Sequence, residues 1–157
     1  MSSFVVTVSG AAGFLSCAQA AQSRDVSSWA KDDASGRQRW KLSPSGKGAN
    51  SYVVTVSGGK DGAFKVLSAR ADSKVVDLFD RDDGSGRQRW LFTQIAQDKR
   101  AFTISCEAGL TAPAKKFLTV NAKTGAYDLR ERLAPGAGAA TQIFTVLEVA
   151  PPTPPPP

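Results

Sequence analysis

The string Asp-Asp-Gly-Ser-Gly-Arg-Gln-Arg-Trp occupies residues 82–90, and it occurs almost unchanged as Asp-Asp-Ala-Ser-Gly-Arg-Gln-Arg-Trp at residues 32–40. Eight of the nine positions are identical, and the two copies lie fifty residues apart. Compositional bias does not explain this match, because the string mixes acids, arginines, glycine, glutamine and tryptophan. A period near fifty residues indicates an architecture built from structural repeats.

Each string closes a unit of four short segments that have the pattern of β-strands. The first strands are expected at residues 4–10, 52–58 and 101–106, where alternation places one set of side chains on a buried face: Val6, Val8, Val54, Val56, Phe102 and Ile104. The second strands are expected at 14–17, 66–69 and 117–120, and the third at 26–29, 76–79 and 127–130. The fourth are expected at 38–42, 88–92 and 142–146. No segment has sustained helical periodicity, so almost no helix is expected.

Twelve short strands in three units predict an all-β fold that is closed and has pseudo-threefold symmetry. In a strand, a Gln and the aromatic residue two positions later share one face. This holds for Gln38 with Trp40, Gln88 with Trp90, and Gln142 with Phe144. Three aromatic side chains then fill one core, while each Gln amide satisfies backbone groups of the preceding turn.

The three Gln-x-aromatic elements resemble the mark of the ricin B-type (R-type lectin) β-trefoil family, a Gln-x-Trp in each of three repeats. The resemblance covers about residues 4–149 and implies a β-trefoil with three four-strand repeats. Residues 1–150 are therefore expected to form a single β-trefoil domain, with repeats at about 1–49, 50–99 and 100–149. Residues 151–157 are interpreted as a proline-rich tail or linker stub. The third repeat is degenerate, since Ala-Pro-Gly-Ala-Gly at 134–138 replaces the acidic turn.

The resemblance implies a non-enzymatic, lectin-like carbohydrate-binding module, but it does not carry over the galactose residues of the family. That family uses an Asp on the second strand, an aromatic platform on the third, and an Asn before Gln-x-Trp. The Asp position holds Ser16, Ser68 and Thr119 here, and the Asn position holds Arg37, Arg87 and Thr141. The platform is retained as Trp29 and Phe79, and its third copy is Arg130.

We therefore expect two shallow ligand sites, on the first and second repeats. An aromatic ring packs against the apolar face of a sugar, while carboxylates and hydroxyls bind its hydroxyl groups. The candidate ligand-binding residues are Trp29, Asp32, Asp33, Ser35, Phe79, Asp82, Asp83 and Ser85. The structural alternative is that Trp29 and Phe79 only cover the core and that the acidic strings are hairpin turns.

Four arginines of the duplicated string are expected to be exposed: Arg37, Arg39, Arg87 and Arg89. They are interpreted either as partners of the neighbouring Asp residues in salt bridges or as direct contacts for an anionic glycan.

Composition limits the classes of function, cofactor and partner that are expected. The 157 residues carry a net charge of +6 and contain no His, which removes the commonest general base and metal ligand, so no catalysis, cofactor or metal site is expected. Two carboxylates in each acidic string are too few for calcium. The expected partners are glycans or glycoproteins, with anionic ligands as a further class and no specific nucleic acid. Cys17 and Cys106 are interpreted as reduced thiols, with a single long-range disulfide as the alternative.

The sequence also bears on localisation and leaves two alternative functions open. No signal peptide or membrane span is visible, which indicates a cytoplasmic or non-classically released protein by default. One alternative function is a protein-interaction β-trefoil resembling mushroom protease inhibitors or actin-binding trefoils, with contact loops at residues 46–50, 58–62 and 107–116. Another is the targeting module of a larger toxin or hydrolase.

Overall fold

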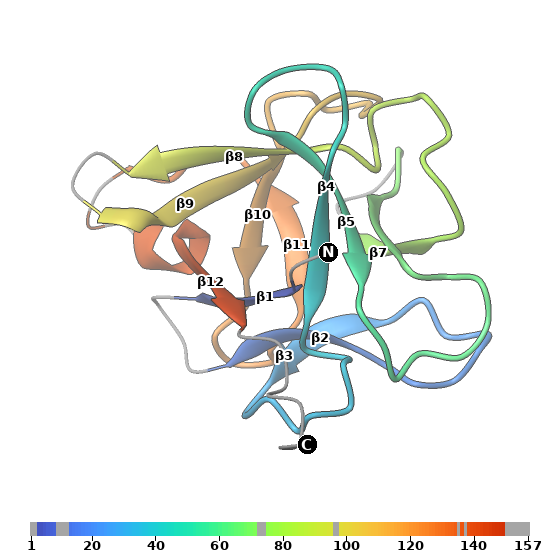
Figure 1. Cartoon of the computed structure of the whole chain (residues 1–157). Coiled ribbons are helices and arrows are strands. Elements are labelled where there is room, and N and C mark those ends of the chain that lie inside the picture. Colours follow the sequence, from blue (N-terminus) through green and yellow to red (C-terminus); the bar gives the residue numbers. More distant parts are fainter. Residues whose placement is uncertain are drawn as a thin grey trace.

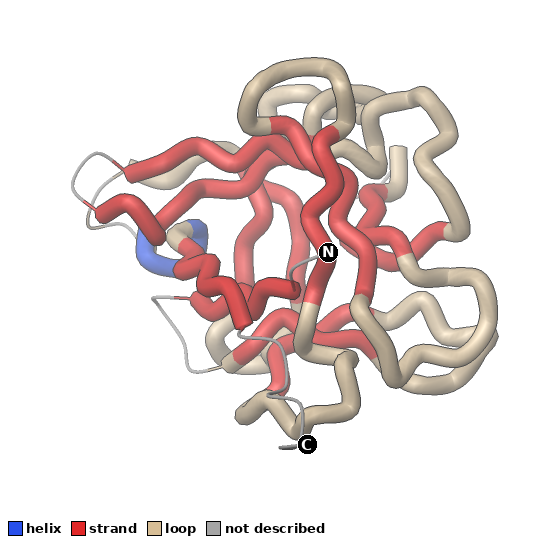
Figure 2. Tube along the Cα trace, in the orientation of Figure 1, coloured by secondary structure: helices blue, strands red, loops and turns tan. Residues whose placement is uncertain are grey.

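A computed structural model of the chain describes residues 3–8, 13–71, 75–95, 98–134, 136 and 138–149. Within these residues the chain forms β-strands joined by loops, with one turn of 3-10 helix (Figures 1 and 2). The first repeat holds β1 (Ser3–Val8), β2 (Phe14–Cys17), β3 (Val26–Trp29) and β4 (Trp40–Pro44). The second holds β5 (Ser51–Val56), β6 (Val66–Ala69), β7 (Val76–Phe79) and β8 (Trp90–Ile95). The third holds β9 (Asp98–Cys106), β10 (Phe117–Val120), β11 (Tyr127–Arg130), the helical turn η1 (Ala139–Gln142) and β12 (Phe144–Val149).

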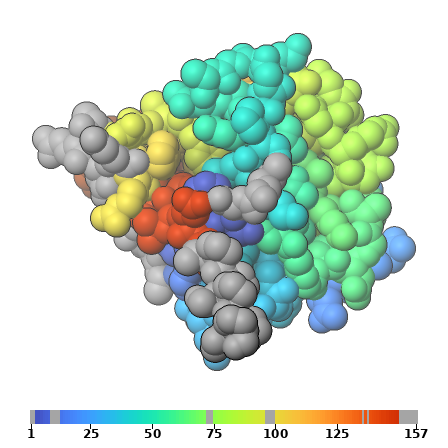
Figure 3. Space-filling model, in the orientation of Figure 1, coloured from blue at the N-terminus to red at the C-terminus, as the bar shows by residue number. Residues whose placement is uncertain are grey.

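Six of these strands close into a barrel. Antiparallel pairing runs from β1 to β4, β5, β8, β9 and β12, and β12 pairs with β1 over the register from Ser3↔Val149 to Val8↔Phe144. On the surface shown in Figure 3, the red residues of β12 accordingly lie beside the dark blue residues of β1. Closure of the sheet leaves no free barrel edge, which is the advantage expected of this architecture.

The remaining strands form the hairpins β2–β3, β6–β7 and β10–β11, one for each repeat. The hairpins meet one another through isolated bridges, Ser27↔Ala126 and Val75↔Asp128, and through the Leu78 N–H, which donates to the carbonyl of Arg24 at 3.1 Å. A six-stranded barrel with three such hairpins is a β-trefoil. The all-β, pseudo-threefold prediction is therefore confirmed.

The second and third strands of all three units have the predicted bounds, whereas β5 ends at Val56, two residues before its predicted bound, and β9 begins at Asp98, three residues before its own. The fourth strands also differ. They begin at the aromatic residue, two positions later than expected, because a turn holds the preceding residues. The Arg39 N–H donates to the carbonyl of Gly36 at 3.1 Å, and Arg89 donates to Gly86 in the same way at 3.2 Å. In the third repeat, Gln142 is the last residue of η1. The proline-rich tail predicted at residues 151–157 lies outside the described residues.

The three glutamines are nevertheless buried together with the aromatic residues, as the sequence predicts. The side chains of Gln38, Gln88 and Gln142 are fully buried, and so are those of Trp40, Trp90 and Phe144. Each Gln Oε1 accepts a hydrogen bond from a backbone N–H of the preceding loop, at Asp33 (3.0 Å), Asp83 (3.0 Å) and Leu133 (2.8 Å). Satisfying backbone N–H groups of the preceding turn is the expected role of the glutamines, and the structure confirms it.

The first strands also bury the predicted face. Val6, Val8, Val54, Val56 and Ile104 belong to the core, while Phe102 is partly buried against it. Five of the six alternating positions therefore lie inside, as period-2 spacing requires of a strand with one buried face.

Candidate functional site

Trp29 ends β3 and is exposed over 47% of its surface. Among the described residues it is the one large aromatic side chain that is exposed. Its backbone is held in the hairpin by antiparallel pairing with Phe14 of β2. An indole on a rigid strand end can bind the apolar face of a ligand without a large loss of conformational entropy, so Trp29 has the properties of a binding platform.

The acidic turn of the first repeat follows Trp29 along the chain, and its carboxylates bind within the turn. Asp32 accepts from the N–H of Ala34 at 3.1 Å and from Nε of Arg39 at 2.9 Å. Asp33 accepts from the N–H of Ser35 at 2.9 Å and from a guanidinium nitrogen of Arg37, also at 2.9 Å. The hydrogen bonds from Ser35 lower the pKa of Asp33, and Arg37 adds to this effect, so the carboxylate is ionised at neutral pH.

The second repeat reproduces this network. Asp82 binds Gly84 and Arg89, and Asp83 binds Ser85 and Arg87, with the same atoms at distances of 2.9–3.1 Å. Hydrogen bonds from Ser85 likewise lower the pKa of Asp83. The duplicated string is thus a self-contained turn in which each acid is paired with an arginine four or seven residues later.

The expectation that Arg37, Arg39, Arg87 and Arg89 are exposed is wrong. Between 17% and 29% of each side chain is exposed, because each guanidinium is folded back onto its Asp. The salt-bridge alternative accounts for all four residues. The same pairing uses Asp32, Asp33, Asp82 and Asp83, whose carboxylates stay partly exposed.

The second-strand position at which the resemblance implied a sugar-binding Asp has a structural role in this chain. Ser16, Ser68 and Thr119 are buried, and their hydroxyl oxygens accept the Gln amide N–H at 2.9, 2.9 and 3.1 Å. These side chains therefore stabilise the core and are not available to a ligand at the surface.

Phe79 occupies the position of Trp29 in the second repeat, but two arginines accompany it. Arg24 places its guanidinium carbon 5.8 Å from the centre of the Phe79 ring and 4.3 Å from that of Phe64. Arg81 lies 5.8 Å from the same Phe79 ring and pairs with Asp80. The two aromatic positions therefore differ, with an exposed indole in the first repeat and a phenyl ring near two arginines in the second.

The sequence pattern does not predict the contacts of Arg24 and Arg81 with Phe79. Arg24 belongs to the first repeat, and only the tertiary contact between hairpins brings it to Phe79, as its carbonyl contact with Leu78 shows. Arg81 lies only two residues after Phe79 in the chain. This short spacing is the sequence signal that indicates a contact between the two side chains.

The third repeat lacks both parts of the predicted site. Arg130 replaces the platform and binds Asp128 through both carboxylate oxygens, at 3.0–3.2 Å. The residue before Leu133 is Arg132, which donates to Oε1 of Gln142 at 3.2 Å where the other repeats have an Asp. The scaffold contact of Gln142 is kept, while the aromatic ring and the acidic pair are absent.

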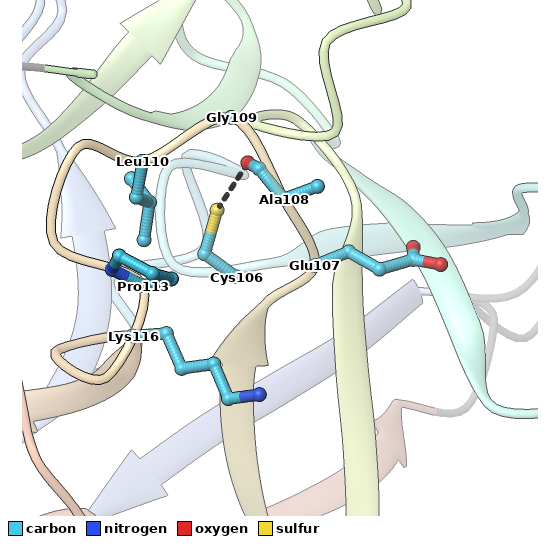
Figure 4. A pocket seen from close by; sticks show the side chains of 7 residues that line it. All are labelled: Cys106, Glu107, Ala108, Gly109, Leu110, Pro113 and Lys116. Atoms are coloured by element: carbon cyan, nitrogen blue, oxygen red, sulfur yellow. Dashed lines mark hydrogen bonds between the residues drawn. The ribbon is translucent and has the colours of Figure 1, made fainter.

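A hollow lies beside Cys106, at the end of β9. It has a volume of about 230 Å³, and Figure 4 shows the sulfur facing the backbone of Ala108, with Leu110 and Pro113 nearby and Glu107 pointing away. The thiol donates to the carbonyl of Ala108 at 3.6 Å, and burial raises its pKa to about 11. Burial also raises the pKa of Cys17 to about 11, and both residues are buried free cysteines in the structure.

The described residues also bear on metal binding and on membrane-spanning helices. Within the described ranges, no three His, Cys, Asp or Glu side chains are grouped so that they could hold a metal ion. Nor does any helix of the described chain have the length and hydrophobicity needed to cross a membrane.

Solved structures of low sequence identity share this fold. Cry35Ab1 is 14% identical, with a TM-score of 0.71 over 99% of this chain and 38% of its own. A lectin from Polyporus squamosus, solved with a human-type influenza-binding epitope, is 21% identical, with a TM-score of 0.66 over 93% of this chain and 48% of its own. A proteinase inhibitor from Coprinopsis cinerea is 15% identical, with a TM-score of 0.65 over 94% of this chain and 97% of its own.

These similarities show the β-trefoil fold, which a lectin and a proteinase inhibitor share. The chain spans less than half the length of Cry35Ab1 and of the Polyporus lectin. Neither a protein-family model nor a curated protein sequence matches it.

Proposed function

We propose that this chain is a non-enzymatic carbohydrate-binding module of the ricin B-type, with its main site at Trp29 and a second site at Phe79. The observation that carries the proposal is the exposed indole of Trp29 on a rigid strand end, next in the chain to an ordered acidic turn. Sugar rings pack against such indoles, and partly exposed carboxylates accept hydrogen bonds from sugar hydroxyls. The first site is therefore Trp29 with Asp32, Asp33 and Ser35, and the second is Phe79 with Asp82, Asp83 and Ser85.

The pairing of each Asp with an arginine supports a weak, neutral-sugar site. Paired carboxylates stay ionised and ordered, so they can accept hydrogen bonds without presenting a net negative charge to the ligand. At Phe79, by contrast, Arg24 adds positive charge beside the ring, while Arg81 is paired with Asp80, so this site is suited to anionic glycans. Two weak sites on one module bind a multivalent glycan through avidity.

Two properties of the chain support the absence of catalysis. It contains no His to act as a general base at neutral pH. Its two thiols are buried with raised pKa values, so neither is an activated nucleophile.

The test is glycan binding by Trp29→Ala, Phe79→Ala and the double variant, measured on a glycan array and then by titration calorimetry. Leu91→Ala is the matched control, since Leu91 is also exposed but lies on β8. We expect Trp29→Ala to weaken binding by about tenfold or more, which corresponds to about 1.4 kcal/mol. A folded double variant that binds every glycan as strongly as the wild type contradicts the proposal.

A protein-interaction module is the second candidate, because the Coprinopsis proteinase inhibitor and this chain match over nearly their full lengths. The loops at residues 46–50, 58–62 and 107–116 would then form the contact surface. Enzymatic deglycosylation of a captured partner separates the two functions. A lectin loses its partner after this treatment, whereas an inhibitor retains it.

A protein with this fold can be much longer than this chain, which spans only 38% of Cry35Ab1. A role as the targeting module of a larger toxin or hydrolase is compatible with carbohydrate binding. Sequencing of the complete coding region tests that role.

A further inference from the structure

One end of the barrel contains an apolar hollow of about 360 Å³ that the carbohydrate sites do not use. Six apolar side chains from the barrel strands line it: Phe4, Leu42, Tyr52, Phe92, Phe102 and Val146. All three repeats contribute to this wall. A volume of this size with a mainly aromatic lining is typical of a site for a small molecule.

The threefold symmetry explains why the hollow exists. Phe4, Tyr52 and Phe102 are equivalent, because each pairs with the first residue of the fourth strand of its own repeat. Leu42, Phe92 and Val146 are also equivalent, since each lies two residues after that first residue. Only Phe92 is large in this second set. Leu42 and Val146 are shorter, and the space that a phenyl ring would fill in their repeats stays open.

The phenyl ring of Phe92 also makes the wall rigid. It packs edge-on against Tyr52, with ring centres 5.5 Å apart, and against Phe102 at 6.0 Å. Edge-to-face contacts of this kind hold aromatic rings in fixed orientations. The hollow is therefore formed mainly by barrel strands and by aromatic rings in edge-to-face contact.

The polar groups of the hollow are neutral and unpaired. Asn50 and Gln94 complete the lining, and both side chains are exposed. Among the described residues, neither side-chain amide has a hydrogen-bond partner, and the hydroxyl of Tyr52 has none either. No charged side chain lines the hollow. Since an ion would lose hydration here without gaining a counter-charge, the lining selects an uncharged ligand.

We propose that this hollow is a binding site for a small, uncharged ligand that has an aromatic or alkyl body and one group able to form hydrogen bonds. The body packs against Phe92, Phe102 and Val146, and the polar group binds the amides of Asn50 and Gln94. This site is built from barrel strands, whereas the carbohydrate sites are built from hairpin ends and acidic turns. It therefore does not depend on the proposed carbohydrate function.

The experiment uses N-phenyl-1-naphthylamine, a neutral fluorescent probe with an aromatic body and one N–H. We expect its fluorescence to rise to saturation with one probe bound per chain. The variant Leu42→Phe/Val146→Phe copies the threefold-related Phe92 and fills the hollow. We expect it to weaken probe binding by at least about tenfold, a loss readily measured by titration. The single variant Val146→Phe provides the same test with less crowding if the double variant does not fold.

Leu91→Phe is the matched control, because it adds a ring at an exposed position of β8 and should leave binding unchanged. Free sugars should not displace the probe. The proposal is overturned if the wild type shows no saturable binding, or if the folded filled variants bind as the wild type does. It is also overturned if sedimentation shows a dimer that the filled variants dissociate, because a second copy is then the occupant.

Discussion

The side-chain amide of Gln38 donates a 2.9 Å hydrogen bond to Oγ of Ser16, 22 residues earlier in the chain, and both side chains are buried. The carbonyl oxygen of the same amide accepts the N–H of Asp33 at 3.0 Å. One side chain thus joins a hairpin strand, a loop and the barrel. The equivalent bonds in the other two repeats make this contact the repeated unit of the scaffold.

Replacement of Gln38 by Ala should lower the free energy of unfolding by about 2–4 kcal/mol, because it removes the partner of the part-buried Asp33 N–H and of the buried Ser16 hydroxyl and opens a cavity. Urea denaturation measures this change. Gln19→Ala is the control, since Gln19 is exposed, and it should alter stability by no more than about 0.5 kcal/mol. A cost below about 1 kcal/mol for Gln38→Ala would show that the amide is not needed for the scaffold.

Ala34→Gly should stabilise the protein by about 0.5–1 kcal/mol. Ala34 has a φ of 67°, which costs energy for a residue with a Cβ atom, and the other copy of the string has Gly84 at this position with a φ of 86°. The reverse change, Gly84→Ala, should destabilise the protein by a similar amount. Thermal unfolding of the two variants gives the comparison, and shifts in the same direction would contradict the explanation by backbone strain.

The protein should lose stability in acid as Asp33 and Asp83 become protonated. Hydrogen bonds from Ser35 and Ser85 lower the pKa values of these carboxyls in the folded state. A lowered folded-state pKa stabilises the protein above the unfolded value of about 3.9, and this contribution is lost as the pH falls through the folded value. The measurement is the free energy of unfolding between about pH 2 and pH 6.

The double variant Asp33→Asn/Asp83→Asn is the test of that assignment. It retains acceptor oxygens but cannot ionise, so its stability should depend less on pH below about pH 4 than that of the wild type. An unchanged slope would assign the acid sensitivity to other carboxyls.

Cys17 and Cys106 should not react with Ellman's reagent in the native protein at pH 8. Their pKa values of about 11 leave very little thiolate at this pH, and both side chains are buried. In denaturant both thiols should react within minutes, with a stoichiometry of two per chain. Rapid native labelling of Cys106 would show that the hollow beside it opens to reagents.

Local pattern was sufficient for most of the fold. The hairpin strands β2–β3, β6–β7 and β10–β11 have the predicted bounds, because alternation and flanking turns are short-range signals. The fourth strands were placed two residues too early, since the bond from Arg39 to Gly36 is a turn that alternation does not reveal. The sequence left two alternatives for the four arginines of the duplicated string, either salt bridges to the neighbouring Asp residues or contacts with an anionic glycan. Only the geometry of the salt bridges showed that these arginines are partly buried.

For the candidate site, the sequence by itself determined the threefold repeat, the burial of the Gln-x-aromatic elements and the positions of Trp29 and Phe79 at equivalent strand ends. These features depend on spacing, and spacing is read directly from the chain. Only the tertiary structure decided that Trp29 is open while Phe79 lies beside Arg24. It also decided that Leu42 and Val146 leave the barrel end hollow beside Phe92. Both outcomes depend on contacts between different repeats, and the relative positions of side chains from different repeats are set by packing and not by local pattern.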